Sequence, residues 1–356
     1  MSSAVVPRVR PTDRLPVLDA LRGTAILCML VAHGVPFLWP TGVSRALELT
    51  LGAVNAVASP LFGLVMGASA ALVWSRPATR RTWPRRVLTD VGRGLVLVVL
   101  GTVLVELGTW VAIVLHVLGV LMVIGIPVAV LAGTGATQRT ARWILGGLVL
   151  ALFAAAPWVT GVIAPSDERL ANGTTGGWAE LWAALTAGYS YRALSLLPFF
   201  ALGALVATVG LFQRPGRLGR LALLAAALLV PAYTLVRRSR DIALSGDWVD
   251  QLFDLTLVAV AGAVIAAAMG ARPRAALWRP LIDLGAVALS VYALQLVVLR
   301  PLMAWDAWAS SRPLAWVSLL TLVLVPSALM IGWRRTLGPG PLERVVALVT
   351  GKGRAT

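Results

Sequence analysis

The chain has 356 residues, of which 58% are hydrophobic and 13% charged, and its mean hydropathy is +0.85. Soluble domains carry about 25% charged residues, so this composition excludes a soluble protein and indicates a polytopic membrane protein. The formal charge of +16 does not indicate nucleic-acid binding, because the basic residues do not alternate with aromatic ones in a soluble module. The single cysteine, Cys28, excludes a disulfide within the chain and a thiolate metal cluster.

Ten apolar runs have the length needed to cross a bilayer, which takes about 20 predominantly apolar residues. Arginine clusters or proline and glycine residues separate the runs. We therefore predict an all-α transmembrane bundle of about ten spans, with a single domain over residues 17–333 between an N-terminal segment, 1–16, and a tail, 334–356. The predicted spans are 17–39, 47–74, 91–107, 110–132, 142–164, 193–211, 219–236, 251–270, 281–304 and 314–333.

The distribution of arginines predicts how this bundle is oriented. Lysine and arginine are retained on the cytoplasmic side of a membrane, and an internal N terminus places the richest clusters inside, among them "RPATRRTWPRR" and "WRRTLGPG". We predict that both termini are cytoplasmic and that the protein is a multi-pass protein of the inner or plasma membrane. The basic loop 237–250 falls outside in this scheme, which indicates either a miscounted span or an anion-binding loop.

The first span carries three ionisable residues, Asp19, Arg22 and His33. Such residues at membrane depth are costly and mark functional sites by default. Arg22 and His33 are eleven residues apart, about three helical turns, so they share a face and lie roughly 16 Å apart along the axis. Asp19 precedes Arg22 by one turn and is expected to be its structural partner. The alternative for Arg22 is a positively charged anchor that reaches the interface.

The other histidine, His116, lies in the fourth predicted span. Because this span is predicted to run inward, His116 reaches a depth similar to that of His33, and Asn55 of the second span can join the two. Structural hydrogen bonds between helices are the alternative for all three residues. A metal site is disfavoured, because the nearest carboxylate on this segment, Glu106, is more than two turns from His116.

Two further features concern helix faces. Gly63 and Gly67 are four residues apart in the second span, so either another helix or a thin ligand can approach the backbone there. In the ninth span Tyr292 and Gln295 are three residues apart and form a polar stripe on one face. Asp283, at the start of that span, is expected to neutralise an arginine such as Arg279 or Arg86.

Several of these segments resemble known membrane acyltransferases. The first span, "RLPVLDALRGTAILCMLVAHG", resembles the family-three membrane acyltransferases, which carry an arginine followed after ten residues by a histidine, here Arg22 and His33. Four other segments resemble the YeiB-like branch, which is related to heparan-α-glucosaminide N-acetyltransferase. They are "ASPLFGLVMGASAAL", "VLHVLGVLMVIGI", "LIDLGAVALSVYALQ" and "GPGPLERVVALV".

The chain also departs from that branch. Asparagine is usual in the branch at the position of His33 and before Tyr292, where this chain has Val291. His33 is therefore the position at which a different chemistry would have arisen on the same fold.

The resemblance implies an acyltransferase that moves an acyl group, expected to be acetyl, from cytoplasmic acyl-CoA to an extracytoplasmic sugar or glycolipid. Guanidinium groups pair with phosphate in a bidentate fork, so Arg22, with Arg85, Arg86 or Arg93, is expected to bind coenzyme A. His33 is expected to act as a general base or to accept the acyl group, with His116 orienting it or stabilising the oxyanion. Asn55, Tyr292 and Gln295 are expected to bind the acceptor.

Other functions remain open at the level of the sequence. A transporter or flippase of an anionic or lipid-linked substrate would use the same arginines without covalent chemistry, and an assembly protein would need neither histidine. No metal and no nucleic acid are expected as partners beside the lipid bilayer. The sequence leaves the acyl group, the acceptor and the oligomeric state open.

Overall fold

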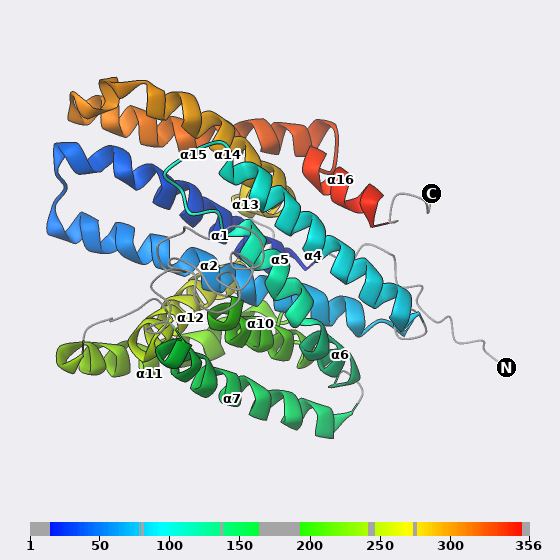
Figure 1. Cartoon of the computed structure of the whole chain (residues 1–356). Coiled ribbons are helices and arrows are strands. Elements are labelled where there is room, and N and C mark those ends of the chain that lie inside the picture. Colours follow the sequence, from blue (N-terminus) through cyan, green and yellow to red (C-terminus); the bar gives the residue numbers. More distant parts are fainter. Residues whose placement is uncertain are drawn as a thin grey trace.

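The structure is a computed structural model, and it describes residues 15–77, 79, 82–135, 138–163, 193–240, 246–272 and 276–350. Within these residues the regular structure is entirely helical, which confirms the predicted all-α class (Figure 1). The α-helices are α1 (Pro16–Gly34), α2 (Arg45–Trp74), α4 (Trp83–Val105), α5 (Leu115–Ile124), α6 (Ile126–Gly135), α7 (Arg139–Ile163), α10 (Ala193–Thr208), α11 (Pro215–Ser239), α12 (Trp248–Ala271), α13 (Trp278–Ala286), α14 (Ala288–Ala304), α15 (Arg312–Thr336) and α16 (Pro341–Val349). Two short 3-10 helices are η1 (Val35–Thr41) and η4 (Asp306–Ala309).

All ten predicted runs coincide with helices, but they do not all cross in the same way. Among the described residues, seven helices are long and apolar enough to span a membrane, and the number rises to nine if each of two bent pairs is one span. The bends are 52° between α5 and α6 and 85° between α13 and α14. Predicted span 193–211 is the shorter apolar helix α10. The prediction of about ten spans therefore corresponds to ten apolar helical segments, of which two are broken.

One of the two bends has a local cause in the sequence. The break between α5 and α6 falls at Gly125 and is followed by Pro127, which has no backbone N–H and whose ring displaces the preceding turn. The break at Val287 has no proline beside it. There the first turn of α14 is held by a side chain from α16 instead, as described below.

Helices α2 and α10 pack closely in the core. A Cβ atom on Gly67 would overlap the carbonyl oxygen of Phe200, and one on Gly203 would overlap the carbonyl oxygen of Leu64. The two backbones are thus in direct contact, which only glycine permits. The structure supports helix packing, rather than a ligand passage, as the reason for Gly67.

The described helices form two groups on either side of α2. In Figure 1, α1, α4, α14 and α15 lie on one side of α2, and α7, α10, α11 and α12 lie on the other. Fully buried side chains such as Leu30, Leu61, Phe199 and Leu296 fill the space between neighbouring helices. The candidate site lies within the first group, around α1.

Two ends of this first group differ in their contacts. At one end the start of α1, the α13–α14 bend and the end of α15 meet, and Arg335 Nε donates to Asp283 Oδ2 at 2.9 Å. The expected pairing of Asp283 with Arg279 or Arg86 is therefore wrong, because the last turn of α15 brings Arg335 to this carboxylate. At the other end Phe37, Trp110 and Trp308 pack edge to face, with ring centroids 5.0 to 5.9 Å apart.

The predicted tail, 334–356, contains a helix. Within it α16 lies against α14 and α4, at the same end of the bundle as the start of α1. The first and the last described helices thus meet at one end, and the assignment of this end to the cytoplasm stays a prediction. Most of the predicted N-terminal segment, 1–16, and residues 351–356 of the tail lie outside the described residues.

Candidate functional site

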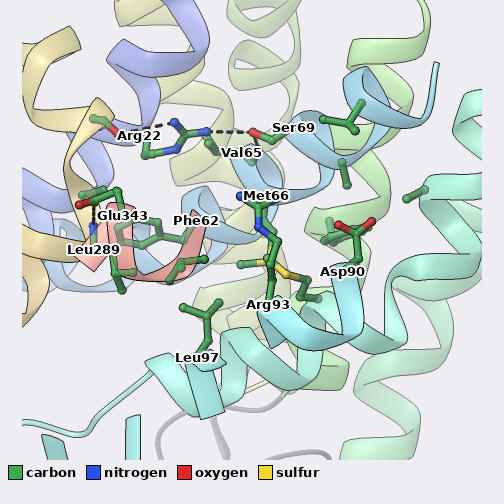
Figure 2. A pocket seen from close by; sticks show the side chains of 18 of the residues that line it. Arg22, Phe62, Val65, Met66, Ser69, Asp90, Arg93, Leu97, Leu289 and Glu343 are labelled. Atoms are coloured by element: carbon green, nitrogen blue, oxygen red, sulfur yellow. Dashed lines mark hydrogen bonds between the residues drawn. The ribbon is translucent and has the colours of Figure 1, made fainter. Parts of the chain in front are cut away.

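A cavity of about 420 Å³, here called the arginine cavity, opens beside α1 (Figure 2). Three arginines and two carboxylates line it, and most of the remaining wall is apolar. The charged residues are Arg22 from α1, Arg86, Asp90 and Arg93 from α4, and Glu343 from α16. Segments that are far apart along the chain therefore build one charged hollow, with lining residues from α1, α2, α4, α5, α6, α10, the α13–α14 bend and α16.

Arg22 is fixed to three elements at this cavity. Its guanidinium donates to Asp19 Oδ1 at 3.0 Å on the preceding turn and to Ser69 Oγ at 2.9 Å on α2, as Figure 2 shows for Ser69. It also donates to the carbonyl oxygen of Gly285 at 3.5 Å, at the end of α13. Only 27% of the Arg22 side chain is exposed. Arg22 is thus part of the cavity wall, and Asp19 is its ion-pair partner.

Arg86 is held by an ion pair that sequence reasoning did not find. Its guanidinium forms a two-pronged interaction with the Asp90 carboxylate, with Nε 2.9 Å from Oδ2 and the second nitrogen on Oδ1. Trp74 Nε1 donates to the same carboxylate at 3.0 Å, and Asp90 is only 6% exposed. The i, i+4 spacing of Arg86 and Asp90 is the sequence signal that indicates this pair. Arg86 is therefore largely neutralised within the wall.

Arg93 differs from the other two arginines of the cavity. It lies one turn beyond Asp90 on α4 and is half-buried, and Figure 2 shows its side chain extending into the cavity. Among the described residues it makes no hydrogen bond and no ion pair. Arg93 is thus the cationic group of the cavity that is available to an anion. Arg85, the fourth predicted arginine, is exposed and does not line the cavity.

The second part of the site surrounds His33, near the end of α1. Gln295 of α14 is fully buried, and its Nε2 lies 2.5 Å from His33 Nδ1. The carbonyl oxygen of His33 accepts a hydrogen bond from Trp110 Nε1 at 3.1 Å. The Oε1 atom of Gln295 has no hydrogen-bond partner in the described part of the chain. The imidazole is therefore oriented by one buried amide.

His33 and Asn55 line a small hollow of about 10 Å³, here called the histidine cavity. Met29 and Ala32 of α1, Ser59 and Phe62 of α2, and Val114 also line it, together with Ala58. Tyr292 reaches the same region, because its hydroxyl oxygen accepts a hydrogen bond from the backbone N–H of Val114 at 3.2 Å. The structure thus brings His33, Asn55, Gln295 and Tyr292 together, as the sequence predicted for residues of one site.

The surroundings of His116, the second predicted histidine, differ from those of His33. It lies on α5 and packs against α4, where a Cβ atom on Gly101 would come within 2.6 Å of the His116 backbone nitrogen. It lines neither the arginine cavity nor the histidine cavity. Gln295 contacts the His33 ring at Nδ1, and the predicted role of His116, to orient His33 or to stabilise the oxyanion, stays a prediction.

Glu343 lines the arginine cavity and contacts α14, although it lies far along the sequence. Its carboxylate accepts hydrogen bonds from the backbone N–H of Leu289 at 2.8 Å and of Ser290 at 3.2 Å, and from the Ser290 hydroxyl (Figure 2 shows the Leu289 bond). These are the first N–H groups of α14, which have no partner within their own helix. Glu343 therefore caps the helix that carries Tyr292 and Gln295. The segment "GPGPLERV" contains this glutamate, but the sequence does not indicate that its partner is the start of α14.

The comparisons with known proteins agree with a membrane enzyme. No curated protein matches the chain. Among protein-family models, acyltransferase family 3, described as an acyltransferase domain, matches residues 15–332. This match includes both cavities apart from the cap supplied by α16. Because it covers most of the chain, which is also a multi-pass helical membrane protein, the chain belongs to acyltransferase family 3 and is a membrane acyltransferase.

Proposed function

We propose that this protein transfers an acyl group, acetyl in the first instance, from cytoplasmic acyl-CoA to an extracytoplasmic glycan or glycolipid. The observation that carries the proposal is the placement of an arginine cavity and a histidine cavity along one helix, α1. Arg22 and His33 are roughly 16 Å apart along that helix. This separation is comparable to the length of the thioester-bearing arm of coenzyme A.

The arginine cavity suits the anionic part of such a donor. Arg93 offers a half-buried guanidinium without an ion-pair partner among the described residues, and Arg22 lies on the opposite wall with Ser69. Charge-assisted hydrogen bonds from arginine to phosphate are short and geometrically specific. The apolar part of the lining, which includes Val65, Met66 and Leu97, suits the arm itself.

The histidine cavity suits the reaction step. A hydroxyl or amine of the acceptor loses its proton to His33 Nε2 as its oxygen or nitrogen bonds to the thioester carbonyl carbon. The carbon–sulfur bond then breaks, and the coenzyme A thiolate takes the proton from the imidazolium. An acyl-histidine intermediate, in which Nε2 attacks the carbonyl carbon first, uses the same geometry. Atoms and charges balance in both routes.

Gln295 decides whether Nε2 can act as that base. A neutral imidazole carries one hydrogen, so a free Nε2 lone pair requires the hydrogen on Nδ1. Nδ1–H needs an acceptor, and the amide oxygen of Gln295 supplies one when the amide is turned by 180° about its last torsion. Oε1, which is otherwise unpaired among the described residues, gains a partner in the turned orientation.

The proposal is tested with purified protein in sealed vesicles and labelled acetyl-CoA. We expect coenzyme A to be released in proportion to label on a glycan acceptor, and both to be lost in His33→Gln. Arg85→Ala is the matched control, because Arg85 is exposed and outside the cavity. Counterflow of a substrate across the membrane without any loss of thioester would overturn the proposal in favour of a transporter.

A further inference from the structure

One face of α2 lines a continuous series of hollows. Glu48, Asn55, Phe62 and Ser69 follow one another at intervals of seven residues. Seven residues make about two turns of an α-helix, so these side chains lie nearly above one another with a rise of about 10 Å from each to the next. From Ser69 to Glu48 the stripe extends about 31 Å, which is about the thickness of the hydrocarbon core of a bilayer.

Three hollows follow this stripe in order. Ser69 lines the arginine cavity, and Asn55 lines the histidine cavity. Glu48 lines a third hollow of about 510 Å³, here called the outer pocket, together with Trp39, Arg45 and Phe253. Asn55 and Ala32 line both the histidine cavity and the outer pocket, so these two are adjacent. The hollows therefore form a row from the arginines past His33 to the far end of α2.

Phe62 is where this row is interrupted. Among the described residues it is the one side chain that lines both the arginine cavity and the histidine cavity. Its phenyl ring is half-buried, and it is the only member of the stripe without a polar group. The other three members, Glu48, Asn55 and Ser69, all offer hydrogen-bonding atoms. An apolar ring thus stands between the anion site and the imidazole.

The space beyond the ring is very small. The histidine cavity measures about 10 Å³, which is about the least that a single water molecule needs. A group that reaches His33 from the arginine cavity must displace the ring of Phe62, and the room gained is that of a side-chain rotation. Each methylene group added to a packed interior costs free energy. A longer acyl group therefore requires more rearrangement around His33 than a two-carbon group.

We propose that Phe62 determines the acyl specificity of the transfer reaction. Its side chain admits an acetyl group to His33 and excludes longer acyl chains. The same ring separates water in the arginine cavity from the thioester. This inference rests on the proposed function for its substrate. The separation of the two cavities by Phe62 is tested independently of that function.

The first experiment measures donor selectivity with acetyl-, propionyl- and butyryl-CoA. In Phe62→Ala we expect the preference for acetyl over butyryl to fall at least tenfold, and the release of coenzyme A without acceptor to rise. Phe62→Leu should lie between Phe62→Ala and the unchanged protein and serves if the alanine variant does not fold. Phe153→Ala is the control, because Phe153 packs on Phe199 at 5.2 Å and lines none of the three hollows. An unchanged preference in both Phe62 variants overturns the proposal.

The second experiment needs no transfer activity. In a Cys28→Ser background, Ser59→Cys places a thiol in the histidine cavity and Ser69→Cys places one in the arginine cavity. A sulfonate-bearing thiol reagent is added to the side of sealed vesicles on which Ser69→Cys reacts. From that side Ser59→Cys should react slowly, and at least tenfold faster when Phe62→Ala is added.

The two experiments separate the two failures. If the unchanged protein transfers no acyl group from any thioester, the proposed function fails, and the labelling rates still decide whether Phe62 is a barrier. If the protein transfers acetyl but Phe62→Ala changes neither selectivity nor labelling, the inference on Phe62 fails and the proposed function stands.

Discussion

The two ends of α1 have different surroundings. Around Arg22 the structure gathers several charges and leaves a cavity of about 420 Å³, whereas around His33 it gathers aromatic and amide groups and leaves about 10 Å³. Ion pairs balance Arg22 and Arg86, and one buried hydrogen bond orients His33. Binding of a large anion tolerates water, but proton transfer to a base gains from a small dry space. In the proposed function, one helix thus separates donor binding from chemistry.

The largest expected effect is at the histidine end. His33→Gln keeps hydrogen bonding and removes the base, so the rate of acyl transfer should fall by about 10²-fold or more. The melting temperature should hardly change, because a hydrogen bond between membrane helices contributes only about 0.6 kcal/mol on average. Transfer rates and thermal unfolding of the purified variant measure the two quantities.

His116 provides the comparison for this variant. Because it lines neither cavity, His116→Gln should reduce transfer far less than His33→Gln. A larger loss of transfer in His116→Gln than in His33→Gln would make His116, rather than His33, the main catalytic residue. Transfer at a normal rate in His33→Gln would remove the catalytic role of the histidine end altogether.

Substitutions at the arginine end should change the affinity for the acyl-CoA donor. Arg93→Ala removes the guanidinium that has no ion-pair partner among the described residues, and hydrogen bonds to charged groups contribute about 1.5–3 kcal/mol. We expect the KM for acyl-CoA to rise by about 10- to 100-fold while kcat stays within about twofold. Steady-state kinetics with Arg85→Ala as the control give both constants. A fall in kcat at constant KM would contradict the separation of the two ends.

Arg22→Lys is a milder change at the same end. It keeps the positive charge beside Asp19 but loses the planar fork that contacts Asp19, Ser69 and Gly285 together. The KM for acyl-CoA should rise by a smaller factor than in Arg93→Ala, with normal membrane insertion. Equal donor affinity in Arg22→Lys and the unchanged protein would leave Arg22 as a membrane anchor.

Substitutions of Gln295 test the hydrogen bond that orients His33. Gln295→Leu removes the acceptor for His33 Nδ1–H and should lower kcat by about tenfold with the donor KM unchanged. Gln295→Glu restores a pure acceptor at the same place and should recover most of the rate, because a carboxylate can hold an imidazole as in a Ser-His-Asp triad. A glutamate variant as slow as the leucine variant would show that the amide nitrogen is the group in use.

The smallest effect is expected from the cap of α14. Glu343→Gln weakens the acceptor for the N–H groups of Leu289 and Ser290, and loss of a helix cap costs about 1 kcal/mol. The melting temperature should fall by a few degrees and kcat should fall slightly, since Gln295 is on the same helix. Leu348→Ala on exposed α16 surface is the control. Unchanged stability in Glu343→Gln would mean that α14 orders without its cap.

Local patterns predicted much of this molecule. The ten apolar runs, the Asp19–Arg22 pair and the common face of Arg22 and His33 depend on spacing along one helix, which the sequence gives directly. The polar stripe of Tyr292 and Gln295 also points toward the predicted site. These features need no knowledge of how the helices pack.

The remaining features depend on packing between distant segments. The contact of Gln295 with His33 joins residues that are 262 positions apart, and it exists because α14 turns by 85° from α13. Asp283 pairs with Arg335 because the last turn of α15 reaches it, and the backbone of α5 at His116 packs against Gly101 of α4. Arg85 and Arg86 are neighbours in sequence, yet only the face of α4 that turns inward places Arg86 at the cavity. Helix rotation and bends are set by the whole bundle, so spacing alone could not reveal them.

The cap supplied by Glu343 has a consequence for biosynthesis. A membrane chain is made from its N terminus, so α1 with Arg22 and His33 is inserted long before α16 leaves the ribosome. Until Glu343 reaches α14, the first N–H groups of that helix lack the partner that holds Gln295 against His33. In a nascent chain that lacks α16, the helix that carries Gln295 is therefore uncapped, and docking of the last described helix completes the support of the candidate site.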